Sequence, residues 1–252
     1  MHWTHPFLLF AAAMVAGGLN AVAGGGSFLT FPSLIFTGVP PIPANATNTV
    51  ALWPGAVASI FGFRQQYRGV ETKLLAEFIV VSFIGGFTGA QLLLHTPQHT
   101  FSKMIPWLML GATVIFTFGR KIIRAIRGEE GHHMSRPLAL LLQLMVSTYG
   151  GFFGAGMGIL MLAILTIMGY EHIHRMNALT SIFATAVNGV ALITFIVARI
   201  VWWPQAMLML VGSVIGGYWA AHYSQKVDPK YVRAFVIFVG CTMTTYFFWK
   251  YF

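Results

Sequence analysis

Two glycine-rich segments contain the residues best suited to bind a small ligand. Gly24-Gly25-Gly26-Ser27 and Gly154-Ala155-Gly156-Met157-Gly158 each interrupt an apolar stretch. Glycine permits a turn with positive φ and lets other groups approach the backbone closely. A helix that resumes after such a turn begins with unpaired amide hydrogens and about half a positive charge. The two segments therefore predict a site for a small anion that needs no buried Arg or Lys.

Polar side chains near the two breaks are further candidates for ligand contacts. Asn20 precedes the first break, while Asn45, Asn48, Asn177 and Thr180 follow the breaks in the two parts of the chain. Their amides and hydroxyls can donate hydrogen bonds to an anion. Asn20 can instead satisfy carbonyls that the turn frees, as can Ser147, Thr148 and Tyr149 before the second break. The residues that follow the breaks can instead be helix caps. Both interpretations stay open at this point. The predicted substrate-binding set is Asn20, Gly24, Gly25, Gly26, Ser27, Asn45, Asn48, Gly154, Gly156, Gly158, Asn177 and Thr180.

The composition indicates that these residues lie in an integral membrane protein. Of the 252 residues, 57% are hydrophobic and 8% are charged, and the mean hydropathy is +0.73. A soluble domain carries about 25% charged residues, so the composition excludes a cytosolic enzyme or a nucleic-acid-binding domain. The net charge of +9 is expected to set orientation, because Lys and Arg gather in cytoplasmic loops. We predict no enzymatic activity, no cofactor and no metal site.

The chain contains an internal repeat at an offset of about 131 residues. Residues 84–90 match 215–221, and Gly38 matches Gly169. The predicted organisation is one membrane domain in three parts. These are a first repeat over 1–119, a cytoplasmic linker over 120–136 and a second repeat over 137–252.

Each repeat divides into a broken apolar pair followed by three long apolar runs. The broken pairs are 7–23 with 28–37 and 137–149 with 159–168. The long runs are 44–63, 74–94, 104–119, 177–197, 204–222 and 233–250. A helix needs about 20 residues to span a membrane, and the piece after each break rises only about 15 Å. We therefore predict an all-α polytopic membrane protein.

The broken pairs are compatible with two arrangements. Each pair can be one interrupted span, giving eight crossings, or a re-entrant hairpin, giving six crossings and two hairpins. The hairpin arrangement places 12 of the 15 Lys and Arg residues on one face, against 10 of 15 for eight crossings, and the positive-inside rule favours it. Three crossings per repeat make the second repeat inverted, as in many secondary transporters. Both termini are then expected outside the cell membrane.

Two further patterns have structural interpretations. The glycines of 84–90 and 215–221 lie within full-length spans, where small residues let neighbouring helices approach closely. Glu77 is the only acidic residue within an apolar run. It follows Lys73 by four residues, so we predict a surface ion pair on one helix.

The motifs together resemble the TauE/SafE, or sulfite exporter, family of membrane transporters. The matching segments are Asn20–Ser27, Phe31-Pro32, Gly38-Val39-Pro40, Ala44–Asn48, Ile84–Ala90 and Gly150–Gly158. The resemblance implies an inner-membrane carrier for sulfite, organosulfonates or other small carboxylate anions. Asn45 and Asn48 depart from the family pattern, in which small residues and Thr are commoner. This difference bears on which anion is transported.

The predicted function is that of a secondary transporter for a small anion, working by alternating access in the lipid bilayer. No nucleotide-binding motif occurs, so an ion gradient is expected to drive transport, and the choice between H⁺ and Na⁺ is left open. An anion channel with the same hairpins is the alternative. No nucleic-acid partner is expected, and the oligomeric state is left open.

Overall fold

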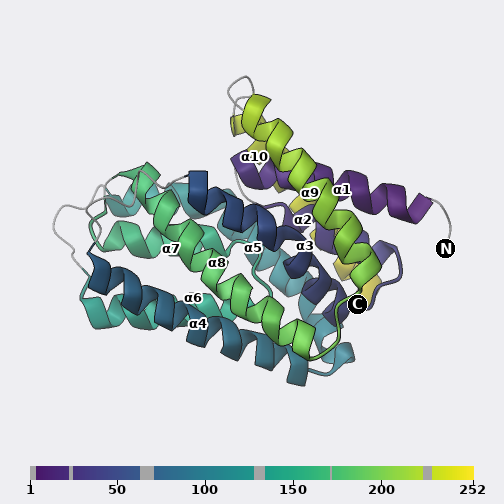
Figure 1. Ribbon diagram of the computed structural model, residues 1–252, viewed down its shortest axis with the longest axis horizontal. Coiled ribbons are helices and arrows are strands. Elements are labelled where there is room, and N and C mark those ends of the chain that lie inside the picture. Colours follow the sequence, from purple (N-terminus) through teal and green to yellow (C-terminus); the bar gives the residue numbers. More distant parts are fainter. Residues whose placement is uncertain (1–3, 23–24, 63–70, 128–133, 171, 224–228) are drawn as a thin grey trace. The chain divides into compact units, whose positions relative to one another are not determined.

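The described residues of the chain form helices joined by short connections, with no strand among them. The computed structural model describes residues 4–22, 25–62, 71–127, 134–170, 172–223 and 229–252 (Figure 1). The helices are α1 (Thr4–Val22), α2 (Ser27–Phe36), α3 (Pro41–Gly62), α4 (Thr72–His95), α5 (Gln98–Arg127), α6 (Arg136–Phe152), α7 (Met157–Ile167), α8 (Ile173–Val197), α9 (Trp203–Tyr223) and α10 (Pro229–Tyr251). The all-α prediction is confirmed.

Helix lengths follow the apolar runs of the sequence. Three stretches in the described chain are long and apolar enough to cross a membrane: Thr72–His95, Gln98–Gly119 and His174–Val197. The second arms of the two breaks, α2 and α7, form short apolar helices of 10 and 11 residues. Such helices are too short to span a bilayer, which needs about 20 residues.

The end of the first predicted repeat is helical beyond its expected boundary. Helix α5 continues to Arg127, well into the stretch predicted as a linker. Residues 128–133, which complete that stretch, lie outside the described residues. The division into two repeats and a linker stays a prediction.

The chain forms two compact units, and each unit takes helices from both predicted repeats. Unit 1 contains residues 1–55, 93–113 and 195–252, and unit 2 contains residues 56–92 and 114–194. The first broken pair, α1 and α2, belongs to unit 1, and we name it hairpin 1. The second pair, α6 and α7, belongs to unit 2 and is named hairpin 2.

In unit 1, hairpin 1 packs against α9 through small residues. Figure 1 shows α1 and α9 crossing. At this crossing, a Cβ on Gly216 would collide with the backbone of Met14, and a Cβ on Gly17 would collide with the backbone of Ser213. The two helix backbones are in direct contact, which only glycine allows. The predicted packing role of the second glycine motif is confirmed at Gly216.

In unit 2, hairpin 2 packs against α4 in the corresponding way. A Cβ on Gly85 would lie 2.8 Å from the carbonyl oxygen of Leu144, and one on Gly89 would collide with the backbone of Thr148. Gly86 contacts α8, because its Cβ would lie 2.8 Å from the carbonyl oxygen of Val187. The packing role predicted for the first glycine motif is therefore confirmed.

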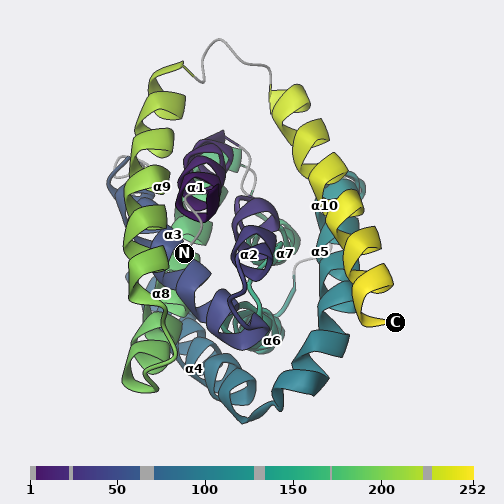
Figure 2. The same ribbon diagram turned by 90° about the vertical axis from the view of Figure 1, so that its right-hand side faces the viewer.

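Aromatic side chains complete the core of unit 1. Helix α10 lies along the first half of α5, as Figure 2 shows, and the rings of Trp107 and Phe248 meet edge to face at 5.1 Å between centroids. Phe31 of α2 lies 6.3 Å from Phe247 of α10, measured between ring centroids, and both side chains are buried. This layer fixes the second arm of hairpin 1 against α10.

Candidate functional site

The turn of hairpin 1 is closed by a side chain from its own first arm. Gly25 has φ +89°, which glycine adopts at no steric cost. The Oδ1 atom of Asn20 accepts a hydrogen bond of 2.8 Å from the amide of Gly26. Asn20 therefore stabilises the turn through its side-chain oxygen, and its predicted contact with a ligand stays a prediction. Gly24, which was predicted to take part, lies outside the described residues.

The first amides of α2 are mostly paired within the turn. Phe28 N donates to Gly25 O at 3.1 Å, and Leu29 N and Thr30 N donate to Gly26 O at 3.0 and 3.2 Å. Bonds that reach back only three residues tighten the first turn of the helix and use donors that an α-helix leaves unpaired. The expectation of unpaired amides is wrong for these three residues.

A buried polar network connects the start of α2 to α3. Asn48 accepts a hydrogen bond from the Thr30 hydroxyl through Oδ1, and its Nδ2 donates to Ser27 Oγ at 3.3 Å. Thr30 also donates to Gly26 O at 3.1 Å. The side chains of Ser27 and Asn48, predicted as ligand contacts, thus meet each other. Thr30 was not singled out from the sequence, although it lies one helical turn after Gly26.

The polar residues of α3 are not helix caps. Helix α3 begins at Pro41, so Asn45 and Asn48 lie more than one turn inside it. Both are buried, and the carbonyl of Asn45 accepts the hydroxyl of Thr49 at 3.0 Å. The capping interpretation is wrong here, because the helix starts earlier than the apolar run.

The turn of hairpin 2 is closed by a side chain at the same spacing. Gly154 and Gly156 have φ +83° and +80°. The hydroxyl of Tyr149 donates to the carbonyl oxygen of Ala155, six residues further on, just as Asn20 reaches Gly26. Tyr149 satisfies a carbonyl that the break frees from helical bonding.

Two polar groups near the start of α7 have no hydrogen-bond partner among the described residues. Met157 N and Ile159 N donate to Gly154 O and Gly156 O at 3.2 and 3.1 Å, but the described residues offer no acceptor to Gly158 N. The hydroxyl of Thr180 on α8 is buried and likewise has no hydrogen-bond partner among the described residues. The two residues are neighbours, because a Cβ on Gly158 would lie 3.6 Å from Thr180 Cγ2.

Asn177 lies one turn before Thr180 on the same helix. Helix α8 begins at Ile173, so neither residue caps it. The carbonyl of Asn177 accepts the hydroxyl of Ser181 at 2.9 Å, and the residue is half-buried. The structure thus brings Gly158 and Thr180 together, whereas for Asn177 it shows only this backbone contact.

Unit 2 contains a buried polar cluster in which Gln143 and Ser82 were not singled out from the sequence. Gln143 of α6 donates through Nε2 to Ser82 Oγ on α4 at 2.9 Å and to Ser147 Oγ at 3.3 Å. All three residues are buried. A polar side chain that is satisfied across two helices holds them in register. Ser82 corresponds to Ser213 in the repeat alignment, and this match was the available signal.

Both broken segments fold back on themselves. Met134 N, just before α6, donates to Ile167 O at the end of α7 at 3.3 Å. In hairpin 1, Leu9 near the start of α1 and Thr37 just after α2 line the same cleft. In each pair, therefore, the first arm begins where the second arm ends.

Glu77 pairs with a partner that the sequence did not suggest. Its Oε2 lies 2.7 Å from Nε of Arg136, the first residue of α6, and Glu71 lies 3.3 Å from the same guanidinium. The predicted pair with Lys73 is therefore wrong. Arg136 is distant from Glu77 in the sequence but adjacent to it in unit 2. Its planar guanidinium matches the geometry of a carboxylate better than a lysine ammonium does.

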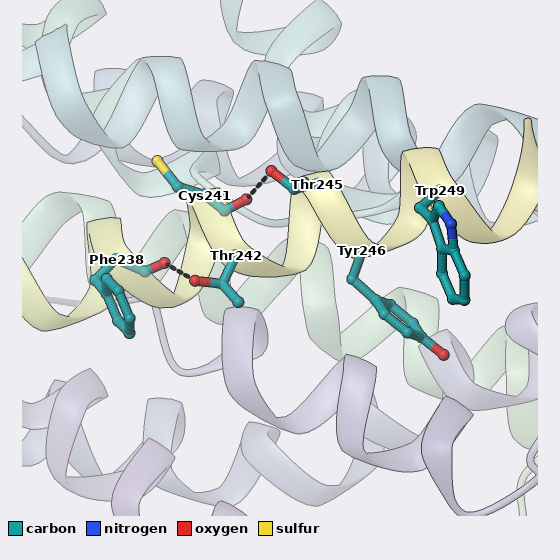
Figure 3. Close-up of a pocket in the computed structure, with 6 residues that line it drawn as sticks. All are labelled: Phe238, Cys241, Thr242, Thr245, Tyr246 and Trp249. Atoms are coloured by element: carbon teal, nitrogen blue, oxygen red, sulfur yellow. Dashed lines mark hydrogen bonds between the residues drawn. The ribbon is translucent and has the colours of Figure 1, made fainter.

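A shallow groove on α10 offers no ligand-binding chemistry. It has a volume of about 570 Å³ and is lined by Phe238, Cys241, Thr242, Thr245, Tyr246 and Trp249 (Figure 3). The hydroxyls of Thr242 and Thr245 donate to carbonyls of their own helix, at 2.9 and 3.0 Å. An exposed apolar helix face of this kind suits contact with lipid.

The helical architecture, the apolar spans and the broken hairpins together define a polytopic membrane protein. A family model described as sulfite exporter TauE/SafE matches residues 9–247, so the chain belongs to this family. The resemblance noted in the sequence is confirmed.

Curated relatives support the same class. The chain is 29% identical to a "probable membrane transporter protein" of Haemophilus influenzae, over 94% of this chain and 92% of that protein. It is 28% identical to the probable membrane transporter protein YfcA of Escherichia coli K12, over 94% and 87%. It is 22% identical to YunE of Bacillus subtilis, over 94% and 96%. No solved structure matches. The family and these names identify a membrane transporter.

Proposed function

We propose that this transporter is a carrier for a small anion, such as sulfite, an organosulfonate or a small carboxylate, and has no enzymatic activity. The observation that carries the proposal is a pair of unsatisfied donors, one at the start of α7 and one on the neighbouring helix α8. Gly158 and Thr180 are neighbouring residues, and the described chain satisfies neither the amide of Gly158 nor the hydroxyl of Thr180. Unpaired donors at a helix N-terminus form an anion site without a buried cation.

The proposed topology has six crossings and two re-entrant hairpins in the inner membrane, with the second repeat inverted. The bond between Met134 and Ile167 supports a hairpin, since an interrupted span would separate these residues by the whole membrane. Thr37 and Arg199 line one cleft, although eight crossings would put them on opposite faces. Both termini then lie outside, as the distribution of Lys and Arg favours.

Counterflow in proteoliposomes tests the cargo and the site. Purified protein is reconstituted with sulfite, methanesulfonate or acetate inside, and the uptake of the labelled anion is followed. We expect Thr180→Val to lower kcat/KM about 10- to 100-fold, because a hydrogen bond to a charged group is lost. Thr88→Val is the matched control, since the Thr88 hydroxyl bonds only to its own helix and is exposed.

A second variant narrows the site without disturbing packing. A methyl on Gly158 would make only ordinary contact with Thr180 at 3.6 Å, so Gly158→Ala should fold normally and still reduce transport. Unchanged transport in both variants would reject this site. Anion conductance without trans-stimulation would show that the protein is an anion channel and not a carrier.

A further inference from the structure

Arg199 occupies a backbone position that elsewhere in this chain belongs to glycine. Helices α2, α7 and α8 end in the same motif, in which the last two amides donate to carbonyls three and five residues back. The left-handed residue is Gly38 after α2 and Gly169 after α7, both with φ +88°, but it is Arg199 after α8, with φ +57°. Among the described residues, Arg199 is the only non-glycine with positive φ. A side chain kept at a strained position points to a function.

Arg199 borders an open cleft within unit 1. The cleft has a volume of about 680 Å³, and its walls include Thr37, Trp202, Trp203 and Gln205. The described chain gives Arg199 no ion-pair partner. The first turn of α9 forms one wall, and the dipole at a helix N-terminus favours an anion.

Gln205 adds a buried group that lacks a partner. It is the third residue of α9 and is 8% exposed, and its Oε1 has no hydrogen-bond partner among the described residues. A buried carbonyl oxygen without a donor is destabilising unless a ligand supplies one. The terminal torsion of glutamine is soft, so the amide can turn toward the cleft that it lines.

We propose that this cleft binds a small oxyanion that carries its own hydrogen-bond donor, such as a phosphate next to an ammonium group. Arg199 and the start of α9 hold the oxyanion, and Gln205 Oε1 accepts the donor. The site is separate from the turn of hairpin 2 and does not depend on the proposed transport function. A soluble solute and a phospholipid headgroup both offer this chemistry.

Binding of two matched probes to the purified full-length protein in detergent tests the donor requirement. O-Phosphoethanolamine carries an ammonium group, and ethyl phosphate does not. We expect the first to bind about tenfold more tightly or better, the factor that one charged hydrogen bond provides. Gln205→Met should abolish this preference and leave the affinity for ethyl phosphate unchanged. Gln98→Met, at an exposed position, is the control.

Arg199→Gly separates binding from folding. Glycine relieves the left-handed backbone, so the unfolding temperature should be equal or higher, while the affinity for both probes falls at least about tenfold. Lys103→Gln removes an exposed cation elsewhere in unit 1 and should change nothing. Undiminished binding in Arg199→Gly, an unchanged preference in Gln205→Met, or no binding of either probe to the wild type would overturn the proposal.

Nanodiscs made of two different lipids distinguish a lipid headgroup from a soluble solute as the ligand. Phosphatidylethanolamine has the donor, and phosphatidylcholine lacks it. If the occupant is a lipid headgroup, phosphatidylethanolamine discs should weaken binding of the soluble probe, and Gln205→Met should remove this difference. Equal affinity in both discs assigns the site to a soluble solute. Thr180→Val should leave probe binding unchanged, so a failure of the transport proposal remains distinguishable.

Discussion

At the residue scale, the two hairpin turns are closed by different chemistry at the same spacing. Asn20 takes up the amide of Gly26, while Tyr149 takes up the carbonyl of Ala155. The Asn20 side chain therefore engages a donor of its turn, and the Tyr149 side chain engages an acceptor. The anion site is assigned to hairpin 2 because the buried hydroxyl of Thr180, next to the start of α7, also has no partner among the described residues.

Loss of the hydrogen bond from Tyr149 to Ala155 should destabilise hairpin 2. Tyr149→Phe leaves the carbonyl of Ala155 without its donor, at a cost of about 1–3 kcal/mol for a buried polar group. We expect a lower unfolding temperature in detergent and slower anion counterflow. Tyr231→Phe is the control, because Tyr231 is 72% exposed. Equal unfolding temperatures for the two variants would contradict the structural role of the hydroxyl.

The sequence singled out most residues near the turns but could not assign their roles. Asn20 and Tyr149 were equally compatible with ligand binding and with turn closure, because residue type does not reveal which group an amide or hydroxyl faces. Asn48 was weighed as a cap, since the apolar run starts after the true helix start at Pro41. Gln143 passed unnoticed because a single polar residue in an apolar run has no periodic signal.

At the element scale, the glycines of α9 show how closely the helices approach. A Cβ on Gly216 would overlap the Met14 backbone, whereas one on Gly217 would lie 3.7 Å from Gly17 O. Neighbouring glycines therefore have different packing roles. Helix periodicity alone could have suggested that they face different directions, but not which of them faces α1.

Substitution of these two glycines should separate a packed position from a tolerant one. Gly216→Ala forces α1 and α9 apart and should cost about 1–3 kcal/mol, the range for overpacked cores. Gly217→Ala makes only ordinary contacts and should be neutral or slightly stabilising, since alanine favours helix. Thermal unfolding in detergent measures both variants. A neutral Gly216→Ala would show that the helices are not in backbone contact.

Helices were the most predictable elements of the chain. Long apolar runs bounded by glycine, proline or charge leave few alternatives to a helix in lipid, because every backbone group must be satisfied internally. Helix α5 was underestimated because its last turns are basic rather than apolar, and hydropathy stops where charge begins. The left-handed cap at Arg199 could not be foreseen, because glycine normally marks such a position.

At the scale of the whole molecule, the compact units do not coincide with the predicted repeats. Hairpin 1 packs on α9 from the second half of the sequence, and hairpin 2 packs on α4 from the first half. The internal similarity of the sequence revealed a duplication, but it did not reveal that each hairpin packs on a helix from the other half. Similarity identifies equivalent segments, whereas contacts between them depend on long-range packing.

Labelling of single cysteines tests the proposed topology. In a Cys241→Ser background, Thr37→Cys and Ala198→Cys should react with an impermeant maleimide from one face of the membrane. Ser135→Cys and Met168→Cys should react only from the other face, because each pair lies at neighbouring ends in the structure. Eight crossings would place the members of each pair on opposite faces, and that result would reject the hairpins.

The packing of hairpin 1 on a helix from the second half of the sequence also affects how the protein folds during its synthesis. Hairpin 1 is complete at Phe36, but its packing partner α9 ends only at Tyr223. At a synthesis rate of about 5–20 residues per second, the two are separated by roughly 10–40 s. During this interval the glycine face of α1 has no partner in the nascent chain. Ribosome pausing or an insertase that shelters α1 should therefore influence the yield of this transporter more than its final stability does.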